Sequence, residues 1–203
     1  MNSCNCGGGI VKLQDGDGLL SMGEVMTMSE QHLIIIRGNS GSGKTTVANA
    51  LRSAMREKFG KGGTMLVSQD AIRIDILDVK DTSDNDSIAL IYDICMYGMK
   101  LKKNVILEGI LDRWKYGEIL LKLISEWQGQ THIYYYNIPL DVTLNRHEMR
   151  PQKELFSKDH MRSWYNSDNC LNIPGERIIT EDVSLGEAIV MIQKDCDERD
   201  RTR

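Results

Sequence analysis

The sequence predicts an α/β fold, in which a parallel β-sheet is covered by helices on both faces. Two observations support this prediction. Runs of β-branched apolar residues alternate with helical stretches about five times along the chain, an order typical of parallel sheets. These runs are apolar at successive positions, as expected of strands that are buried on both faces. At 203 residues, the chain is long enough for one domain with a sizeable core.

The composition narrows the class of protein further. Charged residues make up 27% and hydrophobic residues 41%, as in ordinary globular domains. The formal net charge of −4 gives the chain no overall attraction to nucleic acid or to an anionic membrane. The 5 cysteines are scattered, the pattern of reduced thiols in a cytoplasmic protein. Because no apolar run approaches the roughly 20 residues of a membrane span, we expect no membrane partner.

The first 30 residues differ from the rest of the chain. They contain the turn-forming stretches 7–9 and 15–18, which are rich in glycine. We therefore expect a flexible leader over residues 1–30 and a single domain over residues 31–203. Cys4 and Cys6 lie two apart in this leader, but no second pair of ligands accompanies them, so they make a weak candidate for a metal site.

The first predicted strand, residues 32–37, leads into a motif of the form G-x-x-x-x-G-K-[ST]. Its residues are Gly38, Asn39, Ser40, Gly41, Ser42, Gly43, Lys44, Thr45 and Thr46. The glycines let successive backbone N–H groups face one anion, and the helix that follows adds the positive end of its dipole. Lys44 is expected to reach the β- and γ-phosphates, and the Thr45 hydroxyl to bind Mg²⁺. The motif thus predicts a site for a nucleoside triphosphate.

The second predicted strand, residues 64–68, brings Asp70 and Arg73 to the carboxyl edge of the sheet, where ligands bind in open α/β folds. Asp70 opens a helical stretch predicted over residues 71–79. Two roles remain open for it, that of a helix N-cap and that of a carboxylate facing the site. The two roles are compatible, because a cap at this edge still faces the ligand crevice.

A helix beginning at Ser87 precedes the third predicted strand, residues 104–109. Glu108 closes this apolar run at the position of a Walker B acid, which holds Mg²⁺ through water or contacts substrate. A carboxylate that only caps a turn is the alternative. Asp112 and Arg113 follow in the next loop and are candidates for substrate contact, and a helix is predicted over residues 116–127.

The fourth predicted strand, residues 131–138, is followed by a helix that carries Arg146 and Arg150. Residues four apart share one helical face, and two arginines there would repel unless an anion lies between them. A solvated basic face is the alternative. Pro151 ends this helix, and the polar residues after it suggest a lid over about 146–160. We interpret His147 as a surface residue.

The last predicted elements are a fifth strand over residues 177–180 and a final helix that Ser184 caps.

Residues 32–196 resemble the P-loop kinase family. They look closest to the branch that holds zeta-toxin kinases, polynucleotide 5′-kinases and chloramphenicol phosphotransferase. The resemblance rests on residues 38–46, 68–73 and 105–109 and on the pair Arg146 and Arg150. It implies a three-layer P-loop NTPase sandwich whose five strands have the order 2-3-1-4-5.

The resemblance also implies roles for individual residues. Asp70 matches the aspartate that takes the proton of the acceptor hydroxyl, and Arg73 matches an arginine that binds substrate. Of the lid arginines, one tends to lie near adenine and the other meets the migrating phosphoryl group, so we assign Arg146 to the nucleotide and Arg150 to catalysis, together with Lys44. ATP and Mg²⁺ are the implied cofactors.

The acceptor stays open at this point. A small hydroxyl compound is the leading class, whether nucleoside, sugar, nucleotide sugar or antibiotic. A polynucleotide 5′-hydroxyl kinase is an alternative, although the acidic chain has no aromatic and basic cluster for a strand. Zeta toxins phosphorylate a nucleotide sugar and usually accompany an antidote protein, but their sugar-binding residues find no match here. A non-kinase ATP-binding module is a further alternative. A regulatory GTPase is disfavoured, because its N-K-x-D motif is missing.

Overall fold

The computed structural model describes residues 31–149 and 157–200. The predicted leader over residues 1–30 and Arg150 lie outside the described residues, as does the middle of the predicted lid.

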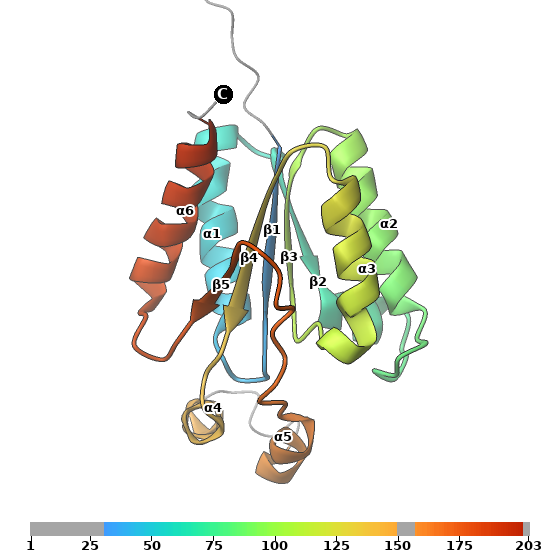
Figure 1. Cartoon of the computed structure of the whole chain (residues 1–203), viewed down its shortest axis with the longest axis vertical. Coiled ribbons are helices and arrows are strands. Elements are labelled where there is room, and N and C mark those ends of the chain that lie inside the picture. The colour runs from blue at the N-terminus through green and yellow to red at the C-terminus, as the bar shows by residue number, and fades with distance from the viewer. Residues whose placement is uncertain (1–30, 150–156, 201–203) are drawn as a thin grey trace, which may run out of the picture.

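The described chain forms one sheet of five parallel strands in the order β2-β3-β1-β4-β5, as predicted (Figure 1). The strands are β1 (His32–Gly38), β2 (Thr64–Ser68), β3 (Asn104–Gly109), β4 (Gln130–Tyr136) and β5 (Glu176–Ile179). All of β1 and β3 is buried. This agrees with their unbroken apolar sequences, because a strand covered by helices on both faces needs no polar side.

Helices cover both faces of the sheet, which gives the three layers that the sequence predicts. Figure 1 shows α1 (Lys44–Phe59) and α6 (Leu185–Asp200) on one face, and α2 (Ser87–Lys100) and α3 (Arg113–Glu126) on the other. The short π-helical segment η1 (Ala71–Ile76) follows β2. Two further helices, α4 (Leu140–Glu148) and α5 (Lys158–Trp164), lie beyond the edge at which the strands end (Figure 1).

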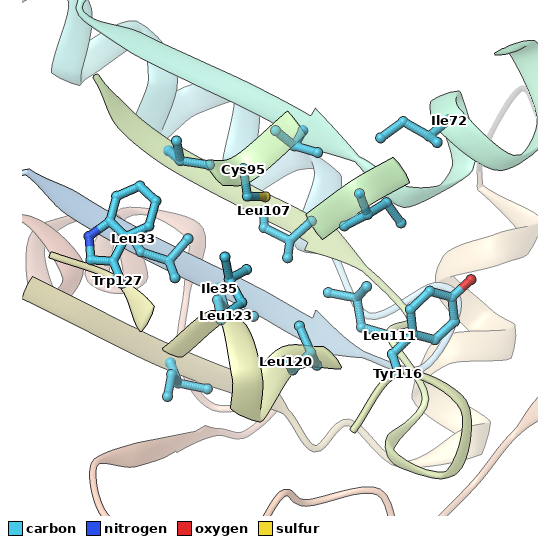
Figure 2. Packing of buried hydrophobic residues seen from close by; sticks show 14 residues of the cluster. Leu33, Ile35, Ile72, Cys95, Leu107, Leu111, Tyr116, Leu120, Leu123 and Trp127 are labelled. Carbon is cyan, nitrogen blue, oxygen red and sulfur yellow. The ribbon is translucent and has the colours of Figure 1, made fainter. Parts of the chain in front are cut away.

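Successive side chains of β1 enter two different cores. Leu33 and Ile35 pack toward α2 and α3, in the cluster that Figure 2 shows around Leu107, Leu120 and Trp127. The intervening side chains of β1 enter a second cluster with α1 and α6. Burial of each aliphatic side chain contributes about 1.5–3 kcal/mol. The two cores therefore fix β1 at the centre of the molecule and with it the loop that β1 carries.

Three local predictions differ from the structure. The segment after Asp70 is π-helical and ends at Ile76 rather than near residue 79, and the Asp70 side chain makes no capping hydrogen bond. The helix α3 begins at Arg113 rather than residue 116, because the Asp112 side chain accepts a hydrogen bond from Trp114 N and caps it. His147 is 3% exposed and is not a surface residue, because α4 turns this side chain toward the body of the protein.

Two other expectations can be set against the described residues. Ser184 does cap α6: its Oγ accepts from Glu187 N at 3.3 Å, while Glu187 Oε2 accepts from Ser184 N at 2.9 Å. Within residues 31–149 and 157–200, no helix has the length and apolar character that crossing a bilayer requires.

Candidate active site

The candidate site begins at the turn between β1 and α1. Three of its glycines have backbone angles that a side chain would strain, with φ of 143° at Gly38, 80° at Gly41 and 102° at Gly43. Gly43 is left-handed and directly precedes α1. The turn therefore curls at the helix N-terminus, where free N–H groups and the helix dipole favour an anion.

Lys44 lies folded inside this turn. Its side chain donates from Nζ to Asn39 O at 2.8 Å and to Ser42 Oγ at 3.2 Å, and the residue is 7% exposed. The ammonium group is thus held among the groups that face the anion, where its charge is most effective.

A buried carboxylate faces the first turn of α1. Glu108 is 4% exposed and accepts hydrogen bonds from Thr45 Oγ1 at 3.0 Å and from Ser68 Oγ at 2.6 Å. The sheet creates this cluster, because parallel pairing sets Glu108 opposite Ser68 on β2. The three side chains offer the hard oxygen donors that Mg²⁺ prefers, so Thr45 and Glu108 fit the predicted metal role directly or through water.

Asp70 lies at the end of β2, next to this cluster. Its Oδ1 accepts from Arg73 Nη2 at 3.1 Å, and its side chain is 64% exposed. Arg73 also donates to Val79 O at 3.2 Å and is 20% exposed. The guanidinium therefore orients the Asp70 carboxylate, while the carboxylate itself stays open to the site.

These groups line one cavity of about 680 Å³ at the carboxyl edge of the sheet. Its walls include Ser40, Gly41, Gly43, Lys44, Thr45, Thr46, Ser68, Asp70, Ile74, Glu108, Gly109, Ile110 and His147. The predicted phosphate loop, the predicted metal ligands and the predicted base thus meet in a single space. His147 reaches this wall from α4.

A second cavity, of about 260 Å³, lies on the other side of the same loop. It is lined by Arg146 and by residues that follow β5, among them Thr180 and Glu181, and it shares Gly43 and Thr46 with the larger cavity. Arg146 Nη1 donates to Ser42 O at 3.1 Å, which fixes the arginine against the loop. The role predicted for Arg146, binding the nucleotide, stays a prediction, and this contact sets the arginine next to the predicted phosphate loop.

Of the residues predicted to bind substrate, Glu108 lines the larger cavity, whereas Arg73, Asp112 and Arg113 are not among its lining residues. Arg73 contacts Asp70 instead. Asp112 caps α3 and accepts from Asn166 Nδ2 at 3.1 Å, while Arg113 donates to Cys170 O at 3.1 Å. Both residues of this pair hold the segment that follows α5, and their role as substrate contacts stays a prediction.

Some site residues were missed by sequence reasoning. Ser68 ends an apolar strand, and only its pairing with Glu108 in the sheet reveals its place beside the metal ligands. His147 follows Arg146, and its burial depends on how α4 packs. Arg37 could have been noticed in the sequence, because it is a charged residue at the end of an otherwise apolar strand.

Arg37 is 0% exposed and lies directly behind the loop. Nη1 is 3.0 Å from Glu176 Oε1, and Nη2 donates to Leu111 O at 2.9 Å and to Asn169 Oδ1 at 3.1 Å. Burial lowers the pKa of Arg37, and the nearby carboxylate of Glu176 opposes that shift. The pair holds the end of β1 in place from the side away from the ligand.

The zeta toxin family model matches residues 21–162, a span that includes the phosphate loop, Asp70, Glu108 and Arg146. The chain belongs to the zeta toxin family. The matched span covers most of the chain, and membership agrees with the resemblance stated above. The chain matches no curated protein.

Solved structures show the same fold in P-loop kinases. The chain is similar to the APS kinase of Mycobacterium tuberculosis, with 16% identity, a TM-score of 0.64, and 83% of this chain and 98% of that chain covered. A gluconokinase of Sinorhizobium meliloti matches with 16% identity, a TM-score of 0.58 and coverage of 84% and 95%. The tunicamycin resistance protein of Deinococcus radiodurans matches with 15% identity, a TM-score of 0.55 and coverage of 82% and 96%. At these identities the likeness shows the fold alone.

Proposed function

We propose that the chain is an ATP- and Mg²⁺-dependent kinase that transfers the γ-phosphoryl group to a hydroxyl group of a small molecule. The observation that carries the proposal is the single cavity that joins the phosphate loop, the Thr45 and Glu108 pair, and the exposed Asp70 carboxylate. Fold neighbours that act on small molecules, the APS kinase and the gluconokinase, support the class of acceptor.

In this proposal the triphosphate lies along the loop. Lys44 leaves Asn39 O and Ser42 Oγ to bind the β- and γ-phosphates, and the loop N–H groups bind the remaining oxygens. Thr45 and Glu108 would hold Mg²⁺, which would supply charge neutralisation at the phosphates. The nucleoside base occupies the second cavity beside Arg146, since that cavity adjoins the loop through Gly43 and Thr46.

The acceptor enters on the side of Asp70. Its hydroxyl oxygen bonds to the γ-phosphorus as the bond from that phosphorus to the β-phosphate oxygen breaks, and its proton passes to the Asp70 carboxylate. The ion pair with Arg73 at 3.1 Å keeps this carboxylate in position. Because phosphoryl transfer needs little covalent help, alignment and charge neutralisation account for the catalysis.

The test is ADP release from ATP by the purified full chain against a panel of acceptors. The panel holds nucleosides, sugars, nucleotide sugars, aminoglycosides, chloramphenicol and 5′-hydroxyl oligonucleotides. We expect one small hydroxyl compound to raise ADP release. Asp70→Asn should lower that rate by about 10²-fold or more while ATP binds as before, since a general base typically contributes this much.

Asp75→Asn is the matched control, because Asp75 is exposed on the same segment and does not line the cavity. It should keep full turnover. Lys44→Ala should weaken ATP binding or turnover, and unchanged turnover would count against the triphosphate site itself. Full turnover in Asp70→Asn would remove Asp70 from the mechanism. ATP binding without any active acceptor would favour a non-kinase ATP-binding module.

A further inference from the structure

A second group of side chains, all of types that can bind a metal ion, lies at the opposite end of the sheet. His32 begins β1, His132 lies near the start of β4, and Cys196 lies on α6. They are 0%, 3% and 5% exposed, respectively. One ligand atom from each, a ring nitrogen of either histidine and the cysteine Sγ, lies within 4.8 Å of the other two.

The fold brings these three residues to one face of the sheet. Parallel pairing sets His132 opposite Ile34, two residues along β1 from His32. Side chains two apart on a strand share a face, so both imidazoles lie on the side of Ile34, which packs in the core under α1 and α6. Cys196 belongs to the same core. All three side chains therefore enter the layer between the sheet and α6.

Neighbouring contacts anchor the start of β1 and the end of α6, two of the elements that carry these side chains. Asn104 Oδ1 accepts from His32 N at 2.9 Å and anchors the start of β1. Asp195, next to Cys196, accepts from Tyr134 Oη at 2.7 Å and pairs with Arg177 Nη2 at 2.7 Å. The end of α6 is thus held on β4 and β5 independently of Cys196 itself.

The geometry supplies three of the four ligands that a tetrahedral transition-metal ion takes. His32 Nδ1 and His132 Nε2 share a hydrogen bond of 3.1 Å between rings tilted by 43°, so the two nitrogens face one another, and an ion would take the place of the shared proton. Two nitrogens bound at about 2.0–2.1 Å to a tetrahedral Zn²⁺ are separated by about 3.3 Å, and a thiolate sulfur binds at about 2.3 Å. Closing the cluster onto an ion requires side-chain shifts of roughly 1 Å.

We propose that His32, His132 and Cys196 form a binding site for a borderline-soft divalent metal ion, with Zn²⁺ the best match. Nitrogen and thiolate ligands select zinc-like ions over Mg²⁺, which prefers oxygen. On binding, the Cys196 thiol loses its proton to solvent. Each imidazole binds in its neutral form with its proton on the nitrogen remote from the ion, so the net release is one proton.

This site is separate from the proposed kinase cavity. His32 and Gly38 are the two ends of β1, and six residues of extended chain span about 20 Å. An ion there cannot touch a phosphate on the loop. Because it joins the last turns of α6 to β1 and β4, it stabilises the native chain, which is the expected role of a site remote from the substrate.

The test uses Co²⁺ and Zn²⁺ alone on the full chain, in the double variant Cys4→Ser, Cys6→Ser, which removes the thiol pair of the amino-terminal segment. Co²⁺ should bind once per chain and give a thiolate-to-cobalt absorption band, which Zn²⁺ abolishes by competition. Zn²⁺ should raise the Tm. Adding Cys196→Ser should remove the band and weaken binding by more than about tenfold, because even groups that only support a metal ligand contribute this much. Adding Cys95→Ser, at a buried cysteine outside the cluster, should change neither.

His132→Gln is the second ligand variant, and it should weaken Co²⁺ binding while leaving a folded chain by circular dichroism. The proposal is overturned if the Cys4→Ser, Cys6→Ser protein gives no band, or if the band survives Cys196→Ser. A rise in Tm that persists unchanged in both ligand variants would also overturn it. None of these readouts depends on kinase activity, so failure of the metal site is distinguishable from failure of the proposed function.

Discussion

Glu108 is nearly buried, and two hydroxyl groups satisfy its carboxylate. Ser68 and Thr45 each donate to one carboxylate oxygen, so the charge is stabilised in place before any ion arrives. A Mg²⁺ ion bound beside Glu108 would replace one of these two hydrogen bonds, and the rest of its site is already formed. The contribution of Glu108 to metal binding therefore comes from its charge, because a neutral side chain of the same shape would still form hydrogen bonds with Thr45 and Ser68.

Glu108→Gln tests this distinction. The amide keeps the shape of the side chain and the hydroxyls can turn to accept from it, so we expect a folded protein whose ATP turnover needs roughly tenfold more Mg²⁺ or falls by a similar factor. Turnover measured against Mg²⁺ concentration decides it. Glu57→Gln, on the exposed side of α1, is the control and should follow the wild type. An unchanged Mg²⁺ dependence in Glu108→Gln would remove this residue from the metal site.

At the scale of elements, the phosphate loop supports the two helices beyond the sheet. A Cβ added to Gly41 would lie 2.9 Å from Met161 Cε on α5 and 3.0 Å from Thr143 O on α4. The first distance is shorter than real Cβ contacts and the second is tighter than most of them, so both neighbours would have to give way. Glycine is therefore needed at position 41 for two reasons, namely the positive φ of the backbone and the close approach of α4 and α5.

Gly41→Ala and Gly60→Ala separate these two requirements. Gly60 has a similar φ of 76°, but an added Cβ there meets nothing within 4 Å. Gly60→Ala should cost about 1–3 kcal/mol in the free energy of unfolding, because φ 76° with ψ 172° is a conformation that only glycine adopts readily, and should leave ATP binding intact. Gly41→Ala should cost more and weaken ATP binding about tenfold, because the end of the Met161 side chain and the backbone at Thr143 must give way beside the loop. Urea unfolding and calorimetric titration measure both effects, and equal costs in the two variants would contradict the close approach.

The strand β4 carries three consecutive buried tyrosines. Burial raises the pKa of Tyr135 to about 12 and that of Tyr136 to about 12, and burial with the hydrogen bond to Asp195 raises that of Tyr134 further. In the unfolded chain these hydroxyls ionise near pH 10. Their contribution to stability is thus fully present below pH 10 and is lost as the pH rises through the folded pKa values.

We expect the free energy of unfolding to fall above pH 10 by about 1.4 kcal/mol per pH unit for each tyrosine. Tyr136→Phe should reduce this slope by about 1.4 kcal/mol per pH unit, the share of one tyrosine. The substitution should cost little at neutral pH, because the Tyr136 hydroxyl has no hydrogen-bond partner among the described residues. Urea unfolding between pH 8 and pH 11.5 measures the slope, with the exposed Tyr97→Phe as control. A slope identical to that of the wild type in Tyr136→Phe would refute the burial effect.

Sequence patterns predicted the elements well because each element carries its own signal. Apolar runs predicted all five strands, and helical spacing predicted the helices that cover them. Element ends were less accurate. The start of α3 depends on one cap at Asp112, and the π-helical form of η1 has no period of its own in the sequence.

Contacts between distant residues could not be predicted in this way. Glu108 was expected from its strand, but its partner Ser68 is 40 residues away. His32 and His132 are 100 residues apart and share no motif. Such contacts follow from strand order and register, which local patterns do not contain. The strand order itself came from family resemblance and not from the chemistry of the strands.

At the scale of the whole molecule, Arg37 joins parts of the chain that are far apart in sequence. Its guanidinium contacts Glu176 on β5, the backbone of Leu111 after β3, and Asn169 between α5 and β5. The ring of Tyr135 lies 5.2 Å from its central carbon. A charge this deep is stable only with its partner, because the cost of removing it from water is otherwise uncompensated.

Glu176→Gln should therefore lower the free energy of unfolding by about 3–5 kcal/mol, since the side chain keeps its shape but leaves the arginine charge unpaired. Glu118→Gln, at an exposed carboxylate of α3, should change it by less than about 0.5 kcal/mol. Combining Glu176→Gln with Arg37→Met removes both charges, and that variant should recover part of the loss even though Leu111 O and Asn169 lose a donor. Urea unfolding of the four proteins measures these differences. If the double variant is no more stable than Glu176→Gln alone, the cost lies in lost hydrogen bonds and not in an unpaired buried charge.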